Sequence, residues 1–426
     1  MHSLYTVLFY LLTPFILLRL LWRSLKAPAY RRRWNERFGF YDKTYSQNVV
    51  WFHAVSVGEA EALFPLLRLL QTRHPGLKLL ITTTTPTGSA RVQAVFGGKA
   101  EHVYLPYDMP FVIGRFLTAF KPRLAVIMET EIWPNLYAAC GRQQIPLFLI
   151  NARLSEKSAR GYRKIPSLIR PTLEHVSLIA AQTADDAERF VQIGAKPDSV
   201  RVMGNMKFDI EIAEETLAQG RRLKASVFGD RFVWILASTH KNEEAPFLNL
   251  YPEIKVEIPD LLLVIVPRHP ERFSEVKNLC EERGLKAVMR TSESPCTAET
   301  DVYDVYIADT MGELKMLYAA ADVAFIGGSL VPVGGHNLLE AAAAGVPVMF
   351  GPYMANFKEI AGGVLAHQAA LQCRSPEEII GTILSLYADP EQRTELADRA
   401  RVFLNENRGA IAAIAELIEA AIPKGG

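Results

Sequence analysis

From residue 49 onward, the chain alternates short apolar runs with longer amphipathic segments, and this alternation constrains the fold more than any other feature. In the first half, the expected strands are residues 49–55, 77–83, 124–128, 146–150 and 178–182, with helices over 61–73, 86–96, 110–120, 133–142 and 184–193. Continuous apolar strands joined by helices form a parallel sheet that is covered on both faces. The first half therefore predicts a doubly wound, Rossmann-like α/β domain.

The same pattern restarts in the second half, after a charged helical stretch at 212–228. Expected strands are 232–237, 261–266, 302–308, 323–326 and 346–350, and the intervening helices include 271–283, 312–321 and 337–344. We therefore divide the chain into an N-terminal segment (1–37), a first domain (38–211), a linker (212–230) and a second domain with a helical tail (231–426). Two doubly wound domains in one chain form a cleft, and ligands bind at the carboxyl ends of the strands in such sheets.

The composition disfavours several classes of protein. The 426 residues include 47 Lys and Arg and 46 Asp and Glu, a net charge of +1, whereas a dedicated nucleic-acid binder needs a basic face. The cysteines (Cys140, Cys280, Cys296 and Cys373) are not at metal-ligand spacing and form no C-x-x-C pair, so we expect reduced thiols. Neither half carries G-x-G-x-x-G with a downstream acid, or G-x-x-x-x-G-K-[ST]; a nicotinamide dehydrogenase and a P-loop phosphotransferase are therefore disfavoured.

Residues 4–18 form an uncharged run, LYTVLFYLLTPFILL, that is short for the roughly 20 apolar residues of a full membrane span. Pro14 within it is better tolerated in a membrane helix than in a soluble one. A cleaved signal peptide is disfavoured because basic residues follow the run rather than precede it. The run predicts a membrane anchor, either spanning the bilayer or lying in one leaflet, with a buried core helix as the alternative.

A basic stretch follows this run and contains a single acid, Glu36. Its cations are Arg19, Arg23, Lys26, Arg31, Arg32, Arg33 and Arg37. A solvated loop would also explain them, but beside an apolar anchor we interpret them as a contact with anionic lipid, each cation contributing on the order of 1 kcal/mol. The positive-inside rule then places the rest of the chain in the cytoplasm.

The first expected strand of the first domain ends in the motif HAVSVGE, at residues 53–59. Ser56 and Gly58 favour a turn, and Glu59 stands at the start of the following helix. Glu59 can complement the helix dipole there, or it can act as a general base that takes a proton from an attacking hydroxyl. Residues alone leave these two interpretations about equally supported.

Three more polar loops follow strands of the first domain. They are TTTTPTG at 82–88, ETEIWPN at 129–135 and NARLS at 151–155, with Arg160 beyond the last. In the first loop, hydroxyls and free amides at a helix start suit a polar or anionic ligand, although an ordinary cap is the better explanation of that loop taken alone. The basic loop can meet a phosphorylated acceptor, or it can pair with Glu129 or Glu131.

The second domain has loops of a different chemistry. They are VPRHP at 266–270, DTMGE at 309–313, GGS at 327–329 and GGHNLLE at 334–340. Arg268 can grip a phosphate in bidentate fashion and His269 can add a donor. Glycines let the backbone approach a ligand, Asn337 can bind a phosphate or cap the helix, and Glu340 can accept hydrogen bonds from ribose hydroxyls. Together these loops predict a nucleotide site.

The combination of HAVSVGE, PTGS, ETEIWPN, NARLS, STH, VPRHPERF, DTMGEL and GGSLVPVGGHNLLEAAAAGVPVMFGP resembles the bacterial 3-deoxy-D-manno-octulosonic acid (Kdo) transferase family, in matching order as far as about Phe357. The resemblance implies a GT-B fold, two Rossmann-like domains facing across a cleft. It implies CMP-Kdo as donor, the lipid A precursor lipid IVA as acceptor and the cytoplasmic face of the bacterial inner membrane as location. The reaction it implies belongs to lipopolysaccharide core assembly. Attack opposite the leaving group implies inversion at the anomeric carbon of Kdo.

The resemblance also assigns roles to individual residues. Glu59 matches the proposed general base of the family. The positions that match its CMP-binding loops, or lie within them, are Arg268, His269, Met311, Gly312, Glu313, Gly335, His336, Asn337 and Glu340. We expect no metal and no cofactor, with charge on the leaving phosphate neutralised by protein groups. One departure is visible: after STH the chain has Lys241 and Asn242 where an acid and a glycine are expected.

Two other functions share these features. The first is a GT-B transferase that moves a UDP-sugar to another membrane lipid, which would have the same two domains and anchor. Measuring whether the protein binds CMP or UDP would distinguish it from a Kdo transferase. The second is a membrane-tethered nucleotide sensor, which stays open because fold alone does not decide function. Such a sensor would bind nucleotide without needing Glu59 and would form no transfer product.

Overall fold

The computed structural model describes residues 1–41, 44–292 and 303–422, so Cys296 and the start of the strand expected at 302–308 lie outside the described residues. The chain divides into two compact units. Unit 1 comprises Met1–Asp209 and Arg408–Gly426, and unit 2 comprises Ile210–Asn407. The last helix therefore belongs to unit 1, although it follows unit 2 in the sequence.

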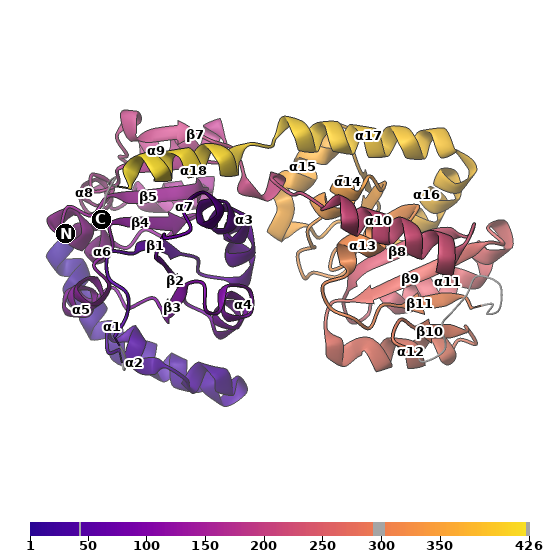
Figure 1. Ribbon diagram of the computed structural model, residues 1–426, viewed down its shortest axis with the longest axis horizontal. Helices are drawn as coiled ribbons and strands as arrows, with labels where there is room; N and C mark the ends of the chain where they lie inside the picture. Colours follow the sequence, from indigo (N-terminus) through magenta and orange to yellow (C-terminus); the bar gives the residue numbers. More distant parts are fainter. Residues whose placement is uncertain (42–43, 293–302, 423–426) are drawn as a thin grey trace. The chain divides into compact units, whose positions relative to one another are not determined.

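The core of unit 1 is a parallel sheet of seven strands in the order β3-β2-β1-β4-β5-β6-β7 (Figure 1). The strands are β1 Val50–His53, β2 Leu79–Thr83, β3 Glu101–Tyr104, β4 Leu124–Met128, β5 Leu147–Ala152, β6 Leu178–Ala181 and β7 Val200–Val202. The chain runs from β1 outward to β3 and then crosses back to β4. The strand order thus reverses between β1 and β4, and doubly wound sheets bind ligands at the carboxyl ends of the two strands that flank this switch point.

The helices of unit 1 begin where short polar side chains cap them. Ser56, Thr85 and Thr183 each accept a hydrogen bond from the backbone N–H three residues on, at the starts of α3, α4 and α9. The helices are α1 His2–Lys26, α2 Trp34–Arg37, α3 Val57–Arg73, α4 Pro86–Phe96, α5 Pro110–Phe120, α6 Pro134–Arg142, α7 Glu156–Tyr162, α8 Pro166–Leu173, α9 Ala184–Gln192 and α18 Ala410–Ala421, with 3₁₀ turns η1 Pro28–Arg31, η2 Pro197–Ser199 and η3 Met206–Phe208.

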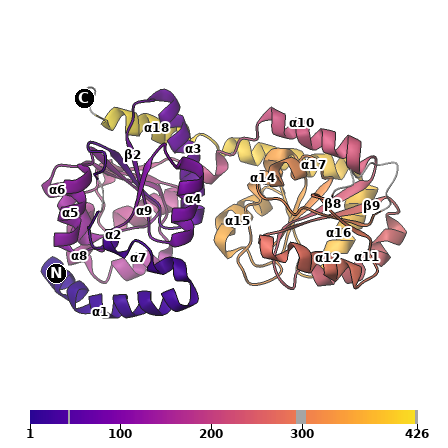
Figure 2. The same cartoon turned by 60° about the horizontal axis from the view of Figure 1, so that its bottom comes forward.

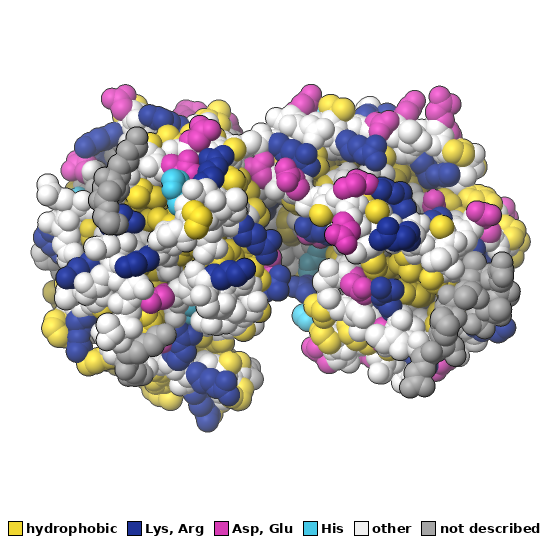
Figure 3. Space-filling model, viewed as in Figure 1, with side chains coloured by type: hydrophobic (Ala, Val, Ile, Leu, Met, Phe, Trp, Pro, Cys, Tyr) yellow, Lys and Arg dark blue, Asp and Glu magenta, His cyan; other side chains and the backbone are white. Residues whose placement is uncertain are grey.

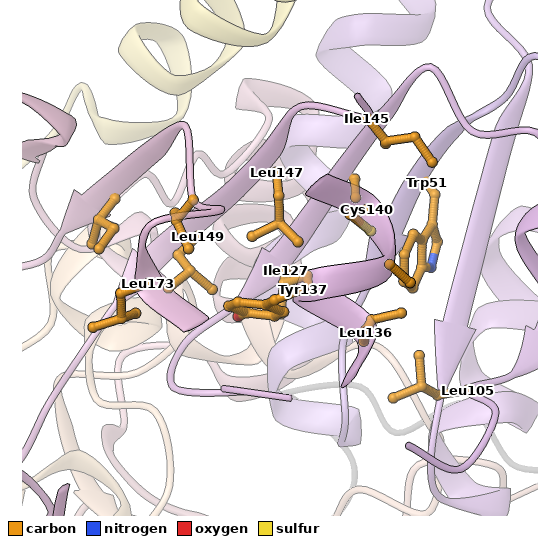
Figure 4. Packing of buried hydrophobic residues seen from close by; sticks show 14 of the residues in the cluster. Trp51, Leu105, Ile127, Leu136, Tyr137, Cys140, Ile145, Leu147, Leu149 and Leu173 are labelled. Carbon is orange, nitrogen blue, oxygen red and sulfur yellow. The ribbon is translucent and has the colours of Figure 1, made fainter. Parts of the chain in front are cut away.

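Each face of this sheet is covered by its own hydrophobic cluster. On one face Trp51 and Ile127 from the sheet pack with Tyr137 and Cys140 of α6, as Figure 4 shows. On the other face, α18 and α3 pack together over the sheet, and Ile414 of α18 is fully buried there. Because both faces are covered, the strands are apolar throughout rather than alternating, as the sequence pattern indicated.

Unit 2 contains a second parallel sheet of seven strands, in the order β10-β11-β9-β8-β12-β13-β14. The strands are β8 Phe232–Thr239, β9 Leu261–Pro267, β10 Ala287–Met289, β11 Val305–Ile307, β12 Val323–Ile326, β13 Val348–Phe350 and β14 Leu371–Gln372. Its switch point lies between β8 and β12. The expected fold class, two doubly wound α/β sheets, is confirmed.

The helices of unit 2 are α10 Glu214–Leu223, α11 Glu244–Glu257, α12 Phe273–Glu281, α13 Leu314–Tyr318, α14 Leu339–Ala344, α15 Lys358–Ala366, α16 Pro376–Ala388 and α17 Pro390–Glu406, with shorter turns η4 Lys224–Phe228, η5 Pro270–Arg272 and η6 Ala355–Phe357. The charged stretch after residue 212 forms α10 and the π-helical η4, and α10 packs on α13. Gly220 permits this contact, because a Cβ there would stand 2.3 Å from the carbonyl oxygen of Met316. The helices expected at 312–321 and 337–344 are shorter in the structure, since their first residues form the loops that carry the site.

Candidate active site in two parts

The first part lies at the switch point of unit 1, where β1 leads into α3. The Glu59 carboxylate accepts a hydrogen bond from the backbone N–H of Val55 at 2.9 Å and another from the Ser56 hydroxyl at 3.1 Å. The Ser56 hydroxyl in turn accepts one from the Glu59 N–H. This reciprocal pattern caps the helix. The capping role that the sequence allowed for Glu59 is therefore present, and the carboxylate remains half-buried rather than covered.

The surroundings of Glu59 shift its protonation. Burial raises the pKa of Glu59 to about 7, the hydrogen bonds from Val55 and Ser56 act to lower it, and the charges of Glu129 and Glu131 act to raise it. A carboxylate with a pKa near neutrality holds an acquired proton better than an ordinary glutamate does. Perturbed pKa values of this kind concentrate at functional sites.

Glu129 and Glu131 follow β4, the other strand at the switch point. Glu129 has a φ of 57°, a left-handed conformation, and its carboxylate lies 4.0 Å from the Nζ of Lys207. Glu131 accepts a hydrogen bond from the Trp133 indole at 2.9 Å, and burial raises its pKa. Three carboxylates and one lysine thus gather around the end of the sheet.

Lys207 was missed by the sequence reasoning, because it lies in η3, far along the chain from the strand-end motifs. Its turn is held in place by Asn151, which lies near the end of β5 and whose side-chain oxygen accepts a hydrogen bond from the Met206 N–H at 3.0 Å. The sequence signal for Lys207 is the run GNMKFD at residues 204–209, which combines turn residues with a single cation.

The arginines expected near these acids have other partners. Arg160 lies 3.4 Å from Glu156 in an exposed ion pair within α7, and it does not pair with Glu129 or Glu131. The backbone carbonyl of Arg153 accepts a hydrogen bond from the Thr130 hydroxyl. The loop 151–155 therefore supports the loop after β4 through its backbone.

The second part of the site lies at the switch point of unit 2, where three imidazoles converge. His240 follows β8, His269 follows β9, and His336 follows β12 through the Gly-Gly loop. The Nε2 atoms of His240 and His336 are 2.8 Å apart and their rings are stacked with centroids 5.0 Å apart, while the His269 ring meets that of His240 edge-on at 5.4 Å. Burial, and after it the neighbouring His240, Arg268 and His269, lower the pKa of His336 to about 4.

A buried carboxylate, Glu243, organises this switch point. It accepts backbone N–H hydrogen bonds from His240 at 2.9 Å, from Gly328 at 2.6 Å and from Leu330 at 3.1 Å, so it ties the loop after β8 to the loop after β12. Next to it, Glu244 forms a buried two-pronged ion pair with Arg272. His240 and these two acids were not among the expected site residues; the consecutive acids that follow STH after two intervening residues were the available signal.

The departure at Lys241 and Asn242 is accommodated within this turn. Asn242 has a φ of 74°, which lies in the left-handed region that glycine adopts freely and asparagine tolerates better than most residues. The turn therefore keeps its shape without glycine, and the acids that follow reach their partners.

The expected nucleotide-binding residues are brought to one edge of the sheet of unit 2. Arg268 and His269 are exposed at the end of β9, beside the β8 loop. The Asn337 side-chain oxygen accepts from the Leu339 N–H at 3.1 Å, and Glu340 lies in the first turn of α14 with its carboxylate 4.0 Å from the Lys315 Nζ. His336 directly precedes Asn337 and is the residue whose ring pairs with that of His240. Because the strands are parallel, all these loops leave the sheet at the same edge.

Two glycines of this region are required by geometry. Gly335 has a φ of 72°, and a Cβ there would lie 2.2 Å from the Met354 sulfur. Gly327 would place a Cβ 2.5 Å from the carbonyl oxygen of Ser238. The backbone of the loop after β12 can therefore lie this close to its neighbours only without side chains.

The loop after β11 contributes Met311, Gly312 and Glu313. The Met311 side chain is exposed, and Gly312 has a φ of 90° with open space where a Cβ would stand. Arg290 binds both carboxylate oxygens of Glu313, at 2.5 and 2.8 Å, and lowers the pKa of that carboxylate. Glu313 thus holds its loop against the end of β10 through Arg290, a residue that the sequence motifs did not include.

The described residues hold no group of three or more His, Cys, Asp or Glu side chains arranged to bind a metal ion. The described cysteines, Cys140, Cys280 and Cys373, are buried, unpaired thiols.

Known proteins resemble this chain over most of its length. A family model described as 3-deoxy-D-manno-octulosonic-acid transferase (kdotransferase) matches residues 32–210. The chain is 38% identical over 418 residues to the 3-deoxy-D-manno-octulosonic acid transferase of Haemophilus influenzae, covering 97% of each chain. It is 38% identical over 370 residues to the transferase of the same description from Bordetella pertussis, covering 85% of this chain and 84% of that one.

Among solved structures, a UDP-GlcNAc 2-epimerase from Neisseria meningitidis, bound to UDP-GlcNAc, has a similar architecture. The TM-score is 0.56 at 18% identity, over 87% of this chain and 99% of that one. At this identity the likeness concerns the fold alone, and it agrees with the GT-B fold of two Rossmann-like domains that the family resemblance implied.

Proposed function

Since the chain belongs to the 3-deoxy-D-manno-octulosonic acid transferase family, we propose that it transfers Kdo from CMP-Kdo to the lipid A precursor lipid IVA, with inversion at the anomeric carbon. Family membership favours this reaction over the transfer of a UDP-sugar. Unit 1 supplies the group that activates the acceptor, and unit 2 supplies the groups that hold the donor.

The observation that carries the proposal is the position of Glu59 at the switch point of unit 1, with a pKa raised to about 7. Ligands of doubly wound sheets bind at this edge. The hydrogen bonds from Val55 and Ser56 fix the orientation of the carboxylate, so it needs no rearrangement to meet a hydroxyl. Its raised basicity suits the removal of a proton from a sugar hydroxyl as that hydroxyl attacks.

The step balances without an added oxidant or reductant. The acceptor oxygen forms a bond to the anomeric carbon of Kdo while its proton passes to Glu59. The bond between that carbon and the phosphate oxygen of CMP breaks, and its electron pair stays on the phosphate. Because the acceptor attacks opposite the leaving CMP, the configuration at the anomeric carbon inverts.

The negative charge that develops on CMP needs stabilisation in unit 2. Arg268 is the exposed guanidinium at the carboxyl end of β9, and the imidazoles of His269 and His336 lie beside the loops that follow β8 and β12. Cationic and N–H donor groups placed where charge develops are a main source of rate enhancement. Met311, Gly312, Gly335, Asn337 and Glu340 complete the proposed nucleotide contacts, with Glu313 supporting their loop.

We place the enzyme on the cytoplasmic face of the bacterial inner membrane, where α1 and the exposed arginines Arg19, Arg23, Arg31 and Arg32 contact anionic lipid. Two cations expected at the lipid are instead used inside unit 1: Arg37 is buried and donates to the Thr84 carbonyl, and Arg33 binds Glu36 and the His102 carbonyl. Lipid IVA is an amphiphile, so an enzyme held at the bilayer surface meets it without extracting it into water. The helix α1 is long and apolar enough to cross a membrane by length and composition, which is weak support for membrane association.

The test is the mass of the lipid product after the detergent-solubilised protein is incubated with lipid IVA and CMP-Kdo. We expect a gain of one or more Kdo residues, and the mass also reports how many are added. Parallel reactions with UDP-sugars on the same lipid serve as the comparison. Product from a UDP-sugar and none from CMP-Kdo would refute the proposal.

A further inference from the structure

The long N-terminal helix α1 presents two different faces along its whole length. One face is half-buried or buried against unit 1: His2, Tyr5, Thr6, Phe9, Thr13, Ile16, Leu17, Leu20 and Ser24. These positions recur every three or four residues from the first turn to the last, which is the spacing of a single helix face. Figure 2 shows α1 running along one side of unit 1. The helix therefore lies along the protein rather than projecting from it.

Polar contacts hold the N-terminal half of α1 in this position. The Tyr5 hydroxyl donates to the Asp108 carboxylate at 2.8 Å, and the Thr6 hydroxyl donates to the Asn135 side-chain oxygen at 2.8 Å. His2 lies 2.8 Å from the same oxygen of Asn135. Two turns further on, the Thr13 hydroxyl contacts the Met109 sulfur at 3.7 Å.

Asp108 belongs to the folded framework of unit 1. Its carboxylate is 3% exposed and accepts the backbone N–H groups of Asn135 at 3.1 Å and Leu136 at 2.8 Å, at the start of α6. Removing Tyr5 from this carboxylate would leave a nearly buried acid without one of its donors, which is costly. The first turns of α1 are thus fastened to the same network that caps α6.

The opposite face of α1 is apolar and open. Leu4, Val7, Leu8, Leu11, Phe15, Leu18 and Leu25 are each between 48% and 69% exposed. Arg19 and Arg23 are exposed on the same helix, and Arg32 follows it. Figure 3 shows basic and hydrophobic surfaces together at the end of unit 1 where α1 ends. An exposed apolar stripe of this length beside arginines fits the boundary between acyl chains and anionic headgroups.

The two faces explain why the sequence is compatible with a membrane span. A helix that is apolar all round must be covered on every side. Here unit 1 covers one side of the helix and leaves the other side open. In a spanning orientation the N-terminal turn would cross roughly 30 Å of hydrocarbon away from unit 1, and Tyr5, Thr6 and Thr13 could not keep their partners.

We infer that α1 lies in the plane of an anionic bilayer surface, with its Leu4-to-Leu25 stripe in the lipid and its Tyr5-to-Ser24 face on unit 1, and does not span the membrane. The N-terminus then stays on the same side of the bilayer as unit 1. The orientation of α1 follows from unit 1 itself and does not depend on which sugar the protein transfers.

The depth of the outward stripe tests this inference. Leu4, Leu11, Leu18 and Leu25 are changed to Cys one at a time in a full-length chain in which Cys296 is replaced by Ala; the other native cysteines are buried. Each variant is labelled with an NBD fluorophore and bound to phosphatidylglycerol-containing vesicles that carry nitroxide lipids at a shallow or a deep position. An in-plane helix predicts the same shallow depth at all four positions. A spanning helix predicts that Leu11 lies about 10 Å deeper than Leu4, because each residue rises about 1.5 Å along the axis. That profile would overturn the inference.

A matched pair of substitutions tests whether the stripe itself binds lipid. Phe15→Glu combined with Leu18→Glu is expected to weaken vesicle binding roughly 100-fold, since each side chain loses the transfer free energy of a buried large apolar group. Val256→Glu is the control, because Val256 is 76% exposed on α11 in unit 2. Equal vesicle binding by the parent and the double variant, or no binding by the parent, would refute the membrane surface. An N-terminal epitope reached by antibody from the opposite side of a sealed vesicle to a C-terminal epitope would refute the in-plane orientation.

Discussion

Glu59 combines two tasks that usually fall to different residues. As part of a capping pair with Ser56 it stabilises the start of α3, and as a half-buried acid near Glu129 and Glu131 it has a raised pKa. The structure contains the cap, and the raised pKa is the property that the proposed role as general base requires. A base that is fixed by its own helix pays little reorganisation when it accepts a proton.

The pH dependence of transfer follows from this environment. Glu59 accepts a proton only as the carboxylate, so kcat/KM should rise with pH through about 7 and level off above it. Glu129→Gln removes a negative charge that raises the pKa of Glu59, so the rising limb should move to lower pH. Initial rates across the pH range measure both effects. Glu156→Gln, in the exposed pair with Arg160, should leave the limb in place; a limb unmoved in Glu129→Gln would contradict the coupling.

Two left-handed glycines of unit 2 make a second prediction at this scale. Gly335→Ala should destabilise unit 2 by about 2 kcal/mol or more and weaken CMP binding, because the new Cβ meets the Met354 sulfur as well as an unfavourable φ. Gly312→Ala has the same unfavourable φ but open space, so its cost should be about 1 kcal/mol. Urea unfolding and CMP titration compare the two; equal losses would show that the contact with Met354 is unimportant.

At the scale of elements, the strands that could be predicted are the long central ones. Runs such as the one that becomes β4 are apolar from end to end because helices cover both faces of the sheet. The edge strands β3, β7, β10 and β14 were not expected, since they are only two to four residues long, and β3, β7 and β14 also carry polar side chains. A short strand at an edge takes its conformation from the neighbour to which it pairs, and that neighbour is not visible in its own residues.

The assignment of α18 to unit 1 was equally hidden from a linear pattern. The pattern of small and apolar residues in α18 shows that one face is buried but not which sheet it covers. Asp209 supplies the answer in the structure: its carboxylate oxygens accept the backbone N–H groups of Gly409 and Ile411, each at 2.5 Å, at the start of α18. Asp209, the last residue of the first segment of unit 1, thus binds the start of α18, the helix of the second segment.

Substitution of this carboxylate tests how firmly α18 is held. Asp209→Ala should cost about 1–2 kcal/mol, the usual loss when a helix N-cap acceptor is removed. Hydrogen exchange should then quicken in α18 more than in α9, which has its own cap at Thr183. Asp209→Asn keeps an acceptor and is the matched control. Uniform acceleration throughout unit 1 would indicate general destabilisation instead.

At the scale of the whole molecule, the two sheets have the same design, and the proposed chemistry is divided between them. Each unit places its polar residues at the switch point, which is why motifs directly after strands were informative in the sequence. Residues that support those motifs from elsewhere in the chain, such as Lys207 for Glu129 and Arg290 for Glu313, follow from the fold and not from spacing. Likewise Glu243 acts through three backbone amides, and no sequence motif shows where those amides lie.

The nearly balanced net charge also acquires a meaning at this scale. With a total of +1, the chain has no overall attraction to an anionic surface. Binding to such a surface must therefore come from a local arrangement, and the arginines near the open apolar face of α1 provide one. The balance that argued against a nucleic-acid binder is compatible with a protein that binds anionic lipid over one small area.

The measurement that tests the central claim most directly is the single-turnover rate of Kdo transfer to lipid IVA by Glu59→Gln, made beside a CMP titration on the same preparation. Glutamine keeps one oxygen that can accept the hydrogen bond from the Val55 N–H, but it does not take the proton. The account predicts a rate at least about 100-fold lower, with CMP affinity unchanged because the proposed CMP site lies in unit 2. A transfer rate within a few-fold of the parent would contradict the assignment of Glu59 as the base.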